Sequence, residues 1–337
     1  MTARRERGWQ DRVVLVTGIG GFVGSSLARE LLASGARVVG IVRDSAGLRK
    51  LELLGIHRRV DLITGDITDP GLVSRCLSEY EVDSIYHLAA QTSSQIARRS
   101  PVPTFESNVS GTWHVLEAAR LSPLVRSVVV ASTDAVSDEQ TGGEQGDGSR
   151  VGSGVQPYDA SKLCADLLAR SYAATYPLPV ATVRCARVYG PGDTNWARLV
   201  PGAVRQALAG EDPVVRGDGK VEGDYLYVTD AVDGYLSAGE HMPEISGSAV
   251  RLGSGQRTSV LGVVRMILAE VGDPGLQPRV LNENGVEPIP PRPALDNARK
   301  LLSWRPRVGL AEGLALTVAW YRDYLSAGKV LAISGGR

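Results

Sequence analysis

Two groups of residues in this sequence have types and spacings that suit chemistry, and the first is a glycine-rich stretch near the N-terminus. Residues 17 to 24 read Thr-Gly-Ile-Gly-Gly-Phe-Val-Gly. Between a strand and a helix, Gly18 would supply a tight turn, Gly21 would let the backbone approach a pyrophosphate, and Gly24 would let the helix pack on the strand. A helix N-terminus also attracts phosphate charge. The stretch therefore predicts a dinucleotide site, although an ordinary strand-to-helix turn would use the same glycines.

The second group is Tyr158 and Lys162, which lie in the stretch Tyr-Asp-Ala-Ser-Lys. On a helix, residues four apart lie on one face. There the lysine ammonium favours the ionised form of the phenol, so the tyrosine can take or give a proton while hydride moves. A surface helix that carries both residues by chance is the alternative. The order of the two groups, with several strand and helix units between them, favours hydride transfer.

The elements that must position these groups alternate between strand-like and helical runs. Residues 12 to 17 form a short apolar, β-branched run typical of a strand buried on both faces, and residues 24 to 33 follow with helical spacing. Similar short runs, separated by amphipathic stretches, occupy residues 37–42, 60–64, 84–88 and 127–131. This alternation predicts an α/β fold with a doubly wound parallel sheet.

Residues 137 to 156 interrupt this alternation. They are rich in Gly, Ser, Asp and Glu and lack apolar periodicity, so we expect a loop that borders the site. A lid and a solvated linker are equally good interpretations of that loop. Past Val180 the chain has more Pro and Gly and shorter elements, with helical spacing at residues 199–208, 259–271 and 310–325.

Composition excludes several classes of protein. Lysine plus arginine balances aspartate plus glutamate at 37 each, so no net charge favours nucleic acid or an anionic membrane as a partner. No apolar stretch is long enough to span a bilayer, and no signal-peptide core precedes the first strand. Cys76, Cys164 and Cys185 are few and far apart, which fits reduced core thiols better than disulfides or a metal site. We therefore expect a cytoplasmic protein of 337 residues with about two domains.

Five further motifs stand in order along the chain, namely Gly65-Asp66-Ile67-Thr68-Asp69, His87-Leu88-Ala89-Ala90, Asn108-Val109-Ser110-Gly111-Thr112, Ser132-Thr133-Asp134 and Val188-Tyr189-Gly190-Pro191-Gly192-Asp193. Together with the glycine turn and the Tyr158–Lys162 pair, they resemble the extended short-chain dehydrogenases/reductases, which include NAD-dependent sugar-nucleotide epimerases and dehydratases. The resemblance covers nearly the whole chain. It implies a Rossmann-type fold, a nucleotide-diphosphate sugar as substrate, and a homodimer formed through the helices around residues 104–119 and 162–172.

The resemblance also implies two domains that interleave in sequence. The dinucleotide-binding domain is expected over residues 1–182, with residues 226–250 returning to it. A smaller substrate-binding domain is expected over residues 183–225 and 251–328, and residues 329–337 form a tail.

A nicotinamide cofactor is implied, with most of its contacts in the motifs above. The positions that match cofactor-binding residues of the family are Gly18, Gly21, Phe22, Val23, Gly24, Arg43, Asp44, Asp66, Ile67, Leu88, Ala89, Ala90, Tyr158 and Lys162. Asp66 matches a residue that contacts adenine, and capping of the turn after the third strand is its alternative role.

The choice between NAD and NADP depends on the end of the second strand. NAD-binding members usually carry an acid there that holds the adenosine ribose hydroxyls. In this sequence Val42 stands at that position, and Arg43 and Asp44 follow. A guanidinium pairs with a 2′-phosphate, whereas Asp44 would suit the ribose of NAD. The sequence favours NADP on this rule.

The expected catalytic group is Thr133, Asp134, Tyr158 and Lys162. Thr133 matches the family hydroxyl that bonds the reacting sugar hydroxyl, and Tyr158 is the expected base. Ser-Thr-Asp also resembles the 4,6-dehydratases, in which the acid and the residue after it remove water across C5 and C6. The residue after Asp134 is Ala135, which cannot take a proton.

Three interpretations of the missing base remain open. Oxidation at C4 followed by return of the hydride to either face gives an epimerase, which the sequence favours. A dehydratase would need a relocated base, such as Glu139 or Glu144, and a net ketoreductase would consume external NADPH. A non-catalytic dinucleotide-binding regulator is the alternative of another class, and the intact proton relay argues against it.

Residues 188 to 236 resemble most the CDP-glucose 4,6-dehydratase branch, with two departures. Arg187 replaces a frequent asparagine, and Gly223 replaces the arginine that holds the nucleotide diphosphate. We hypothesise that Arg187 supplies the charge that Gly223 no longer gives. The expected substrate-binding residues are Gln91, Arg187, Asn195, Arg198, Leu199, Arg216 and Arg292.

Overall fold

A computed structural model of the protein describes residues 8–136, 156–282 and 296–334. Contacts within the chain divide it into two compact units. The first unit comprises Met1–Cys185, Val232–Leu252 and Pro293–Arg305. The second comprises Ala186–Ala231, Gly253–Arg292 and Pro306–Arg337.

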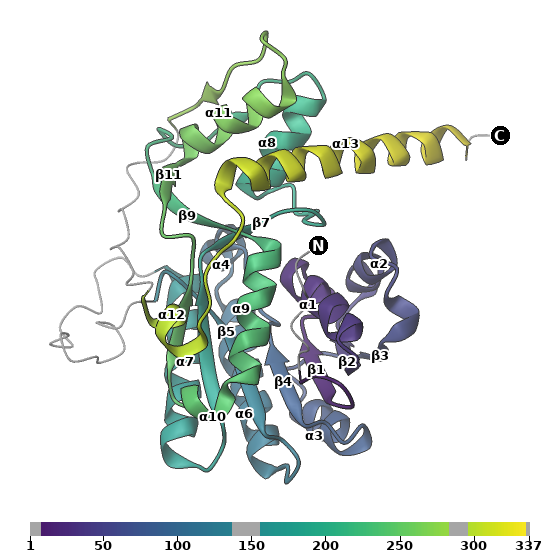
Figure 1. The fold of residues 1–337 in the computed structure, drawn as a ribbon, viewed down its shortest axis with the longest axis vertical. Helices are drawn as coiled ribbons and strands as arrows, with labels where there is room; N and C mark the ends of the chain where they lie inside the picture. Colours follow the sequence, from purple (N-terminus) through teal and green to yellow (C-terminus); the bar gives the residue numbers. More distant parts are fainter. Residues whose placement is uncertain (1–7, 137–155, 283–295, 335–337) are drawn as a thin grey trace, which may run out of the picture. The chain divides into compact units, whose positions relative to one another are not determined.

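The first unit is built on a seven-stranded parallel sheet with the strand order β10-β6-β5-β4-β1-β2-β3 (Figure 1). The strands are β1 (Val13–Thr17), β2 (Arg37–Val42), β3 (Asp61–Thr64), β4 (Ser84–His87), β5 (Ser127–Thr133), β6 (Val180–Cys185) and β10 (Ala249–Leu252). The order runs outward in both directions from β1, which confirms the predicted doubly wound α/β fold. Ligands of such folds bind at the carboxyl ends of the strands, near the point where the order reverses.

Helices connect these strands. They are α1 (Phe22–Ala33), α2 (Ser45–Leu53), η1 (His57–Arg59), α3 (Pro70–Glu79), α4 (Ser94–Arg99), α5 (Val102–Phe105), the π-helical turn η2 (Glu106–Ser110), α6 (Gly111–Leu121), α7 (Pro157–Thr175), α10 (Met242–Ile245) and α12 (Asp296–Leu302). A core of buried side chains, among them Leu15, Val73, Val115 and Val128, joins the sheet to these helices. The core excludes water from the strands, so the polar groups at their ends are held on a rigid support.

The second unit holds a three-stranded sheet with the order β11-β9-β7 and a two-stranded pair, β12-β8. The strands are β7 (Arg187–Tyr189), β8 (Val214–Val215), β9 (Glu222–Tyr227), β11 (Arg257–Ser259) and β12 (Arg279–Val280). The helices are α8 (Leu199–Leu208), α11 (Val260–Val271) and α13 (Leu310–Ser334). Its core is rich in aromatic side chains, with Tyr189, Tyr227 and Tyr321 all buried.

Helix α9 (Val228–Glu240) begins in the second unit, and its residues from Val232 onward belong to the first. The contact units differ from the predicted domains at α12, which packs with β10 of the first unit. Asn297 on α12 explains this packing, because its side chain hydrogen-bonds the backbone of Ala249 and Arg251. The assignment of cofactor and sugar to separate domains stays a prediction.

Most predicted elements lie where the sequence placed them, and α13 is the main difference. Its helix runs to Ser334, whereas apolar spacing predicted an end near residue 325. None of the helices in the described part of the chain is long and apolar enough to cross a membrane.

Candidate active site

The glycine turn between β1 and α1 has the close packing that its residues predict. Gly18 has a φ of 71°, and a Cβ there would lie 2.6 Å from the Ala89 amide nitrogen. A Cβ at Gly24 would lie 2.2 Å from the Gly18 carbonyl oxygen. Helix α1 follows Gly21 with no side-chain cap and no acidic residue in its first turn. Its first amide groups are therefore left for an anion, so the turn fits a pyrophosphate.

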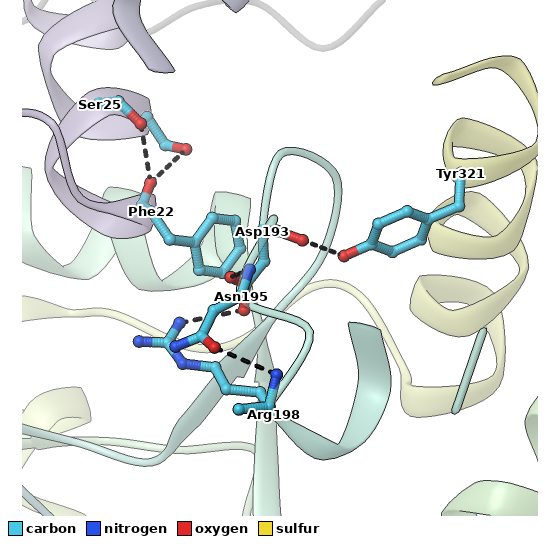
Figure 2. A network of polar contacts seen from close by, with 8 residues as sticks. Phe22, Ser25, Asp193, Asn195, Arg198 and Tyr321 are labelled. Atoms are coloured by element: carbon cyan, nitrogen blue, oxygen red, sulfur yellow. Dashed lines mark hydrogen bonds and ion pairs between the residues drawn. The ribbon is translucent and has the colours of Figure 1, made fainter. Parts of the chain in front are cut away.

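Phe22 and Val23 form the first turn of α1. The Phe22 carbonyl oxygen accepts hydrogen bonds from the hydroxyls of Ser25 and Ser26, at 3.1 and 3.0 Å (Figure 2). Both bonds use the carbonyl oxygen of Phe22, so they do not engage the amide N–H groups of the first turn of α1.

Arg43 and Asp44 lie between β2 and α2, and they differ in how far they are engaged. Asp44 is the N-cap of α2, since its Oδ1 accepts from the amides of Ala46 and Gly47 at 3.0 and 3.2 Å. The bond from Gly47 and, to a smaller extent, that from Ala46 lower the pKa of Asp44. Arg43 is 68% exposed, and its Nε lies 3.7 Å from Asp44. Oδ1 of Asp44 is thus engaged by the helix, although the Asp44 side chain is 53% exposed, and the guanidinium of Arg43 extends into solvent.

Asp66 and Ile67 lie in the turn after β3. Asp66 Oδ1 accepts from both the amide and the hydroxyl of Thr68, each at 3.0 Å. Ile67 is buried and packs against Gly111, where an added Cβ would lie 2.4 Å from Ile67 Cδ1. The capping role of Asp66 is therefore present in the structure, and its adenine contact stays a prediction.

His87 joins β4 to β1 and α6. In the sequence it stands only as the first residue of the His87-Leu88-Ala89-Ala90 motif, with no role predicted for its side chain. Its Nδ1 lies 2.8 Å from Thr17 Oγ1, and its Nε2 lies 2.9 Å from Thr112 Oγ1. The Thr112 hydroxyl donates to the Asn108 carbonyl at 2.6 Å, so it must accept from His87 Nε2. Burial, and after it the charge of Lys162, lowers the pKa of His87 to about 3. The ring is therefore neutral, with its proton on Nε2.

This tautomer settles the role of Thr17. With Nδ1 unprotonated, the Thr17 hydroxyl donates to His87 and accepts from the Ala89 amide at 3.3 Å. The Leu88 amide in turn donates to the Thr17 carbonyl at 3.1 Å. The backbone of the Leu88-Ala89-Ala90 segment is thus tied to the end of β1, beside the glycine turn.

Asn108 extends the same polar connection to α7. Its Nδ2 donates to the Gln91 carbonyl at 3.0 Å and to Ser161 Oγ at 2.9 Å, and the Ser161 hydroxyl donates to the Tyr158 carbonyl at 2.7 Å. Asn108 lies in the π-helical turn η2, where the sequence predicted a plain helix. Such turns are frequent at functional sites because they redirect side chains.

Gln91 is engaged on both ends of its side chain. Its Nε2 donates to the Ser93 carbonyl and to Thr104 Oγ1, each at 3.2 Å, and its Oε1 accepts from the Ser93 amide. A substrate contact by Gln91 would have to replace one of these bonds, and that role stays a prediction.

Lys162 and Tyr158 lie on α7, one turn apart. Lys162 is buried, and its Nζ donates to the Ala131 carbonyl on β5 at 2.6 Å. Burial lowers the pKa of Lys162 to about 8, and the charge of Asp166 acts in the opposite direction. The ammonium is thus held at β5, two residues before Thr133, and it keeps its charge at neutral pH.

Thr133 ends β5, with Asp134 and Ala135 directly after it. The Thr133 hydroxyl lies 3.3 Å from Asp134 Oδ1 and accepts from the Ala135 amide at 3.3 Å. The Asp134 amide donates to the Cys185 carbonyl at 3.2 Å, which fixes this turn to the end of β6. Thr133 and the Ala131 carbonyl that holds Lys162 thus lie on the same strand, and Ala135, two residues after Thr133, is exposed.

In the second unit, Arg187 on β7 pairs with Tyr225 on β9, and its guanidinium lies against Gly223 of the same strand. A Cβ at Gly223 would lie 2.8 Å from Arg187 Nη1 and 3.0 Å from its Nε. The guanidinium lies over the Tyr225 ring, 5.9 Å from its centroid. Arg187 is exposed, and within the described residues it forms no ion pair. The arginine thus occupies the space that a side chain at position 223 would need.

Arg198 is engaged differently, as Figure 2 shows. Its Nη1 lies 3.0 Å from Oδ2 of the buried Asp193, whose Oδ1 accepts from the Asn195 amide at 3.1 Å. Tyr321 on α13 donates to the Asp193 carbonyl. Asn195 Oδ1 accepts from the Ala197 amide at 3.2 Å, and Leu199 begins α8. These contacts explain Arg198 and Asn195 as parts of a turn, and their substrate contacts stay predictions.

The remaining predicted residues divide into two cases. Arg216 is exposed on the second unit, after β8. Arg292, Glu139 and Glu144 lie outside the described residues, as does nearly all of the predicted loop at 137–156.

Comparisons with known proteins agree on one family. Residues 14–253 match the NAD dependent epimerase/dehydratase family. A UDP-glucose 4-epimerase of Mycolicibacterium smegmatis is 34% identical over 92% of this chain and 98% of its own length. A dTDP-glucose 4,6-dehydratase of Xanthomonas campestris is 32% identical over 91% of this chain and 92% of its own. The crystal structure of a dTDP-glucose 4,6-dehydratase of Bacillus anthracis with NAD has a TM-score of 0.77, 26% identity, and coverage of 93% and 97% of the two chains.

Proposed function

The chain belongs to the NAD-dependent epimerase/dehydratase family, and from that premise we propose that it oxidises C4 of a nucleotide-linked hexose and returns the hydride, in an epimerase-type cycle. Its relatives are enzymes that modify nucleotide sugars, and the Rossmann-type sheet and proton-relay residues of this chain suit that chemistry.

The proposed proton transfers use three residues of the first unit. When bound, the nicotinamide accepts hydride from the sugar and gives it back. Tyr158 takes the proton of the C4 hydroxyl, and Thr133 holds the same oxygen by a hydrogen bond. The Lys162 ammonium, fixed on the Ala131 carbonyl, stabilises the tyrosinate that results.

Ala135 is the observation that carries the epimerase proposal. A dehydratase must remove the C5 proton, and the side chain that follows Asp134 here is a methyl group that cannot accept it. Without that base the 4-keto sugar keeps its C6 hydroxyl, and reduction from the other face inverts C4. Identity to the relatives does not discriminate, since the epimerase is 34% and the dehydratase 32% identical.

The second candidate is a 4,6-dehydratase with a relocated base, which the Ser-Thr-Asp motif favours. Glu139 and Glu144 are the residues that would supply it. The resemblance of residues 188 to 236 to the CDP-glucose branch also points this way. A non-catalytic regulator is a weaker proposal, because a sensor has no need of the buried Lys162 and its tyrosine.

For the cofactor, we propose NADP over NAD, bound by the glycine turn and the first turn of α1. Asp44 gives its Oδ1 to the cap of α2, which leaves it less able to hold both ribose hydroxyls. The exposed Arg43 is a suitable partner for a 2′-phosphate. The ratio of dissociation constants for the two cofactors tests this choice.

For the substrate, we propose that Arg187 binds a phosphate oxygen of the nucleotide diphosphate. It is an exposed cation without an acid partner among the described residues, and Tyr225 supports its guanidinium from one side. A bidentate guanidinium is the usual partner of phosphate oxygens.

We also propose a homodimer and a cytoplasmic location. Helices α5, α6 and α7 pack together and leave Val102, Phe105, Trp113 and Leu167 exposed. Large apolar side chains gathered on packed helices are typical of an interface. All three cysteines are free, which suits a reducing compartment.

The test of the main proposal is the mass of the product. The purified protein is incubated with UDP-, dTDP- and CDP-glucose and catalytic amounts of NAD or NADP. An epimerase conserves mass and yields the C4 epimer, whereas a dehydratase loses water and accumulates a 4-keto-6-deoxy sugar. Water loss at a useful rate would replace the epimerase by the dehydratase, and turnover unchanged in Tyr158→Phe would refute both.

A further inference from the structure

Helix α7 carries one more charged residue on the face that holds Tyr158 and Lys162. Asp166 follows Lys162 by four residues, so the three side chains lie one above another along the helix. Asp166 is fully buried. A carboxylate without a partner does not stay ionised in such a place.

The partner of Asp166 is Arg184, the last residue but one of β6. Arg184 Nε and Nη2 lie 3.1 and 2.7 Å from Asp166 Oδ1 and Oδ2, and both side chains are 0% exposed. Two parallel bonds between a guanidinium and a carboxylate fix orientation as well as distance. The pair therefore sets the rotation of α7 against β6, while Lys162 binds the same helix to β5.

The surroundings of Lys162 leave Asp166 as its counter-charge. The charge of Lys162 acts on His87 of β4, and its Nζ donates to the Ala131 carbonyl of β5. On α7, Tyr158 precedes Lys162 by one turn and Asp166, paired with Arg184 of β6, follows it by one turn. His87 is neutral, and Arg184 is cationic. Burial lowers the pKa of Lys162 to about 8, and among the described residues the charge of Asp166 raises it.

We propose that Asp166 is a positioning residue for the proton relay: held by Arg184, it seats α7 on the sheet and supplies the negative charge that keeps the buried Lys162 ammonium protonated. The inference rests on the proposed function in that Lys162 assists Tyr158. Its physical content, the protonation of Lys162, is independent of any substrate.

The first experiment titrates Lys162 directly. The chain has five lysines, namely Lys50, Lys162, Lys220, Lys300 and Lys329, so the ε-carbon resonances of ¹³C-lysine-labelled protein are few. Lys162→Met identifies the signal of Lys162. In the wild-type protein we expect a midpoint near pH 8. In Asp166→Asn we expect it to fall by about one unit, a tenfold loss of proton affinity.

Two further variants separate charge from folding. Asp166→Asn alone leaves Arg184 buried without a counter-charge, which is strongly destabilising. The paired variant Asp166→Asn/Arg184→Met removes both charges and should fold. Because the repulsion from the Arg184 cation is lost as well, we expect its midpoint to lie below the wild-type value but above that of Asp166→Asn. Arg184→Lys keeps the charge of Asp166 but loses the double hydrogen bond, so it should destabilise the fold and leave the midpoint near the wild-type value.

The alkaline limb of turnover with a sugar nucleotide should move to lower pH together with the midpoint. An unchanged midpoint in both Asp166 variants overturns the inference, whatever their turnover. A lowered midpoint in a protein that turns over no sugar nucleotide supports the role of Asp166 and contradicts the proposed function instead.

Discussion

Four buried polar groups of the first unit and two exposed cations of the second are built in opposite ways. His87, Asn108, Lys162 and Asp166 are buried, and each has a hydrogen-bond partner on another element. Arg187 and Arg216 are exposed, and neither forms an ion pair within the described part of the chain. Buried networks fail when one member changes, because an unpaired group is costly, whereas an exposed cation can move at little cost.

This difference separates two parts of the proposed function. The residues of the proposed proton relay are held by contacts among β4, β5, α6 and α7, so the fold fixes their positions. Two of the residues proposed to bind the substrate, Arg187 and Arg216, lie at strand ends, and we propose that Arg187 takes the place of a cation at position 223. Substitutions in the relay should therefore have larger effects than substitutions of the exposed cations.

The largest effect is expected for Tyr158→Phe. Loss of the phenol removes the proposed base and should lower kcat by about 10²- to 10⁴-fold, with little change in the melting temperature. Tyr176→Phe, at the exposed end of α7, is the matched control and should retain turnover. A fall in both variants would place the effect in the helix and not in the phenol.

The second prediction concerns acid stability through His87. Its pKa is about 3 in the folded protein against an ordinary value of 6.5, so the unfolded chain takes up the proton first. The stabilisation is complete above pH 6.5 and is lost as the pH falls towards 3, on the order of 5 kcal/mol in total. His87→Gln should flatten this part of the curve of unfolding free energy against pH.

His241→Gln, a partly exposed histidine after α9, is the control for this experiment and should leave the slope as it is. Equal slopes in wild-type protein and His87→Gln would show that His87 takes up its proton in the folded state as readily as in the unfolded one. The neutral tautomer and the rigid connection of Thr17 to Ala89 would then have to be abandoned.

The same division explains what the sequence could predict. Short apolar, β-branched runs located the strands of the first half, and the glycine turn and the Tyr158–Lys162 pair could be read directly, because these signals are local. The Asp166–Arg184 pair and the bonds of His87 join residues far apart in sequence, so no local pattern reveals them. One signal was available: Arg184 is a charge inside an otherwise apolar strand, which requires a buried partner.

Some residues predicted to bind a ligand turn out to hold their own neighbours in the chain. Asp44 precedes a helical run, where aspartate is a preferred N-cap, so its commitment to α2 was foreseeable. The pairing of Arg198 with Asp193 was harder to foresee, because it depends on a turn whose shape Tyr321 of the distant α13 helps to fix. The sequence shows that Arg187 and Arg198 are present, but it does not show that Arg187 is exposed and that Arg198 is paired with an acid.

The third prediction tests whether the exposed cation can be relocated. Arg187→Asn should lower kcat/KM for the sugar nucleotide by about tenfold to a hundredfold, mainly through KM, since a charge-assisted hydrogen bond to phosphate is lost. The double variant Arg187→Asn/Gly223→Arg restores a cation on the neighbouring strand, and the removed guanidinium frees the space that the new Cβ needs. We expect it to recover most of the loss.

Arg279→Asn, an exposed arginine on β12 of the same unit, serves as the control and should leave KM unchanged. If the double variant is no better than Arg187→Asn, the cation cannot be exchanged between the strands. Arg187 would then act at its own position, and the proposed freedom of the second unit would be wrong.

The smallest effect is expected at Arg43, which is an exposed cation of the first unit and so an exception to the division. Arg43→Ala should raise the dissociation constant of NADP by about fivefold, in line with the low worth of exposed charge pairs, and should leave that of NAD nearly unchanged. Arg49→Ala, exposed on α2, is the control. Equal effects on both cofactors would mean that Arg43 does not recognise the 2′-phosphate, and the preference for NADP would lose its physical basis.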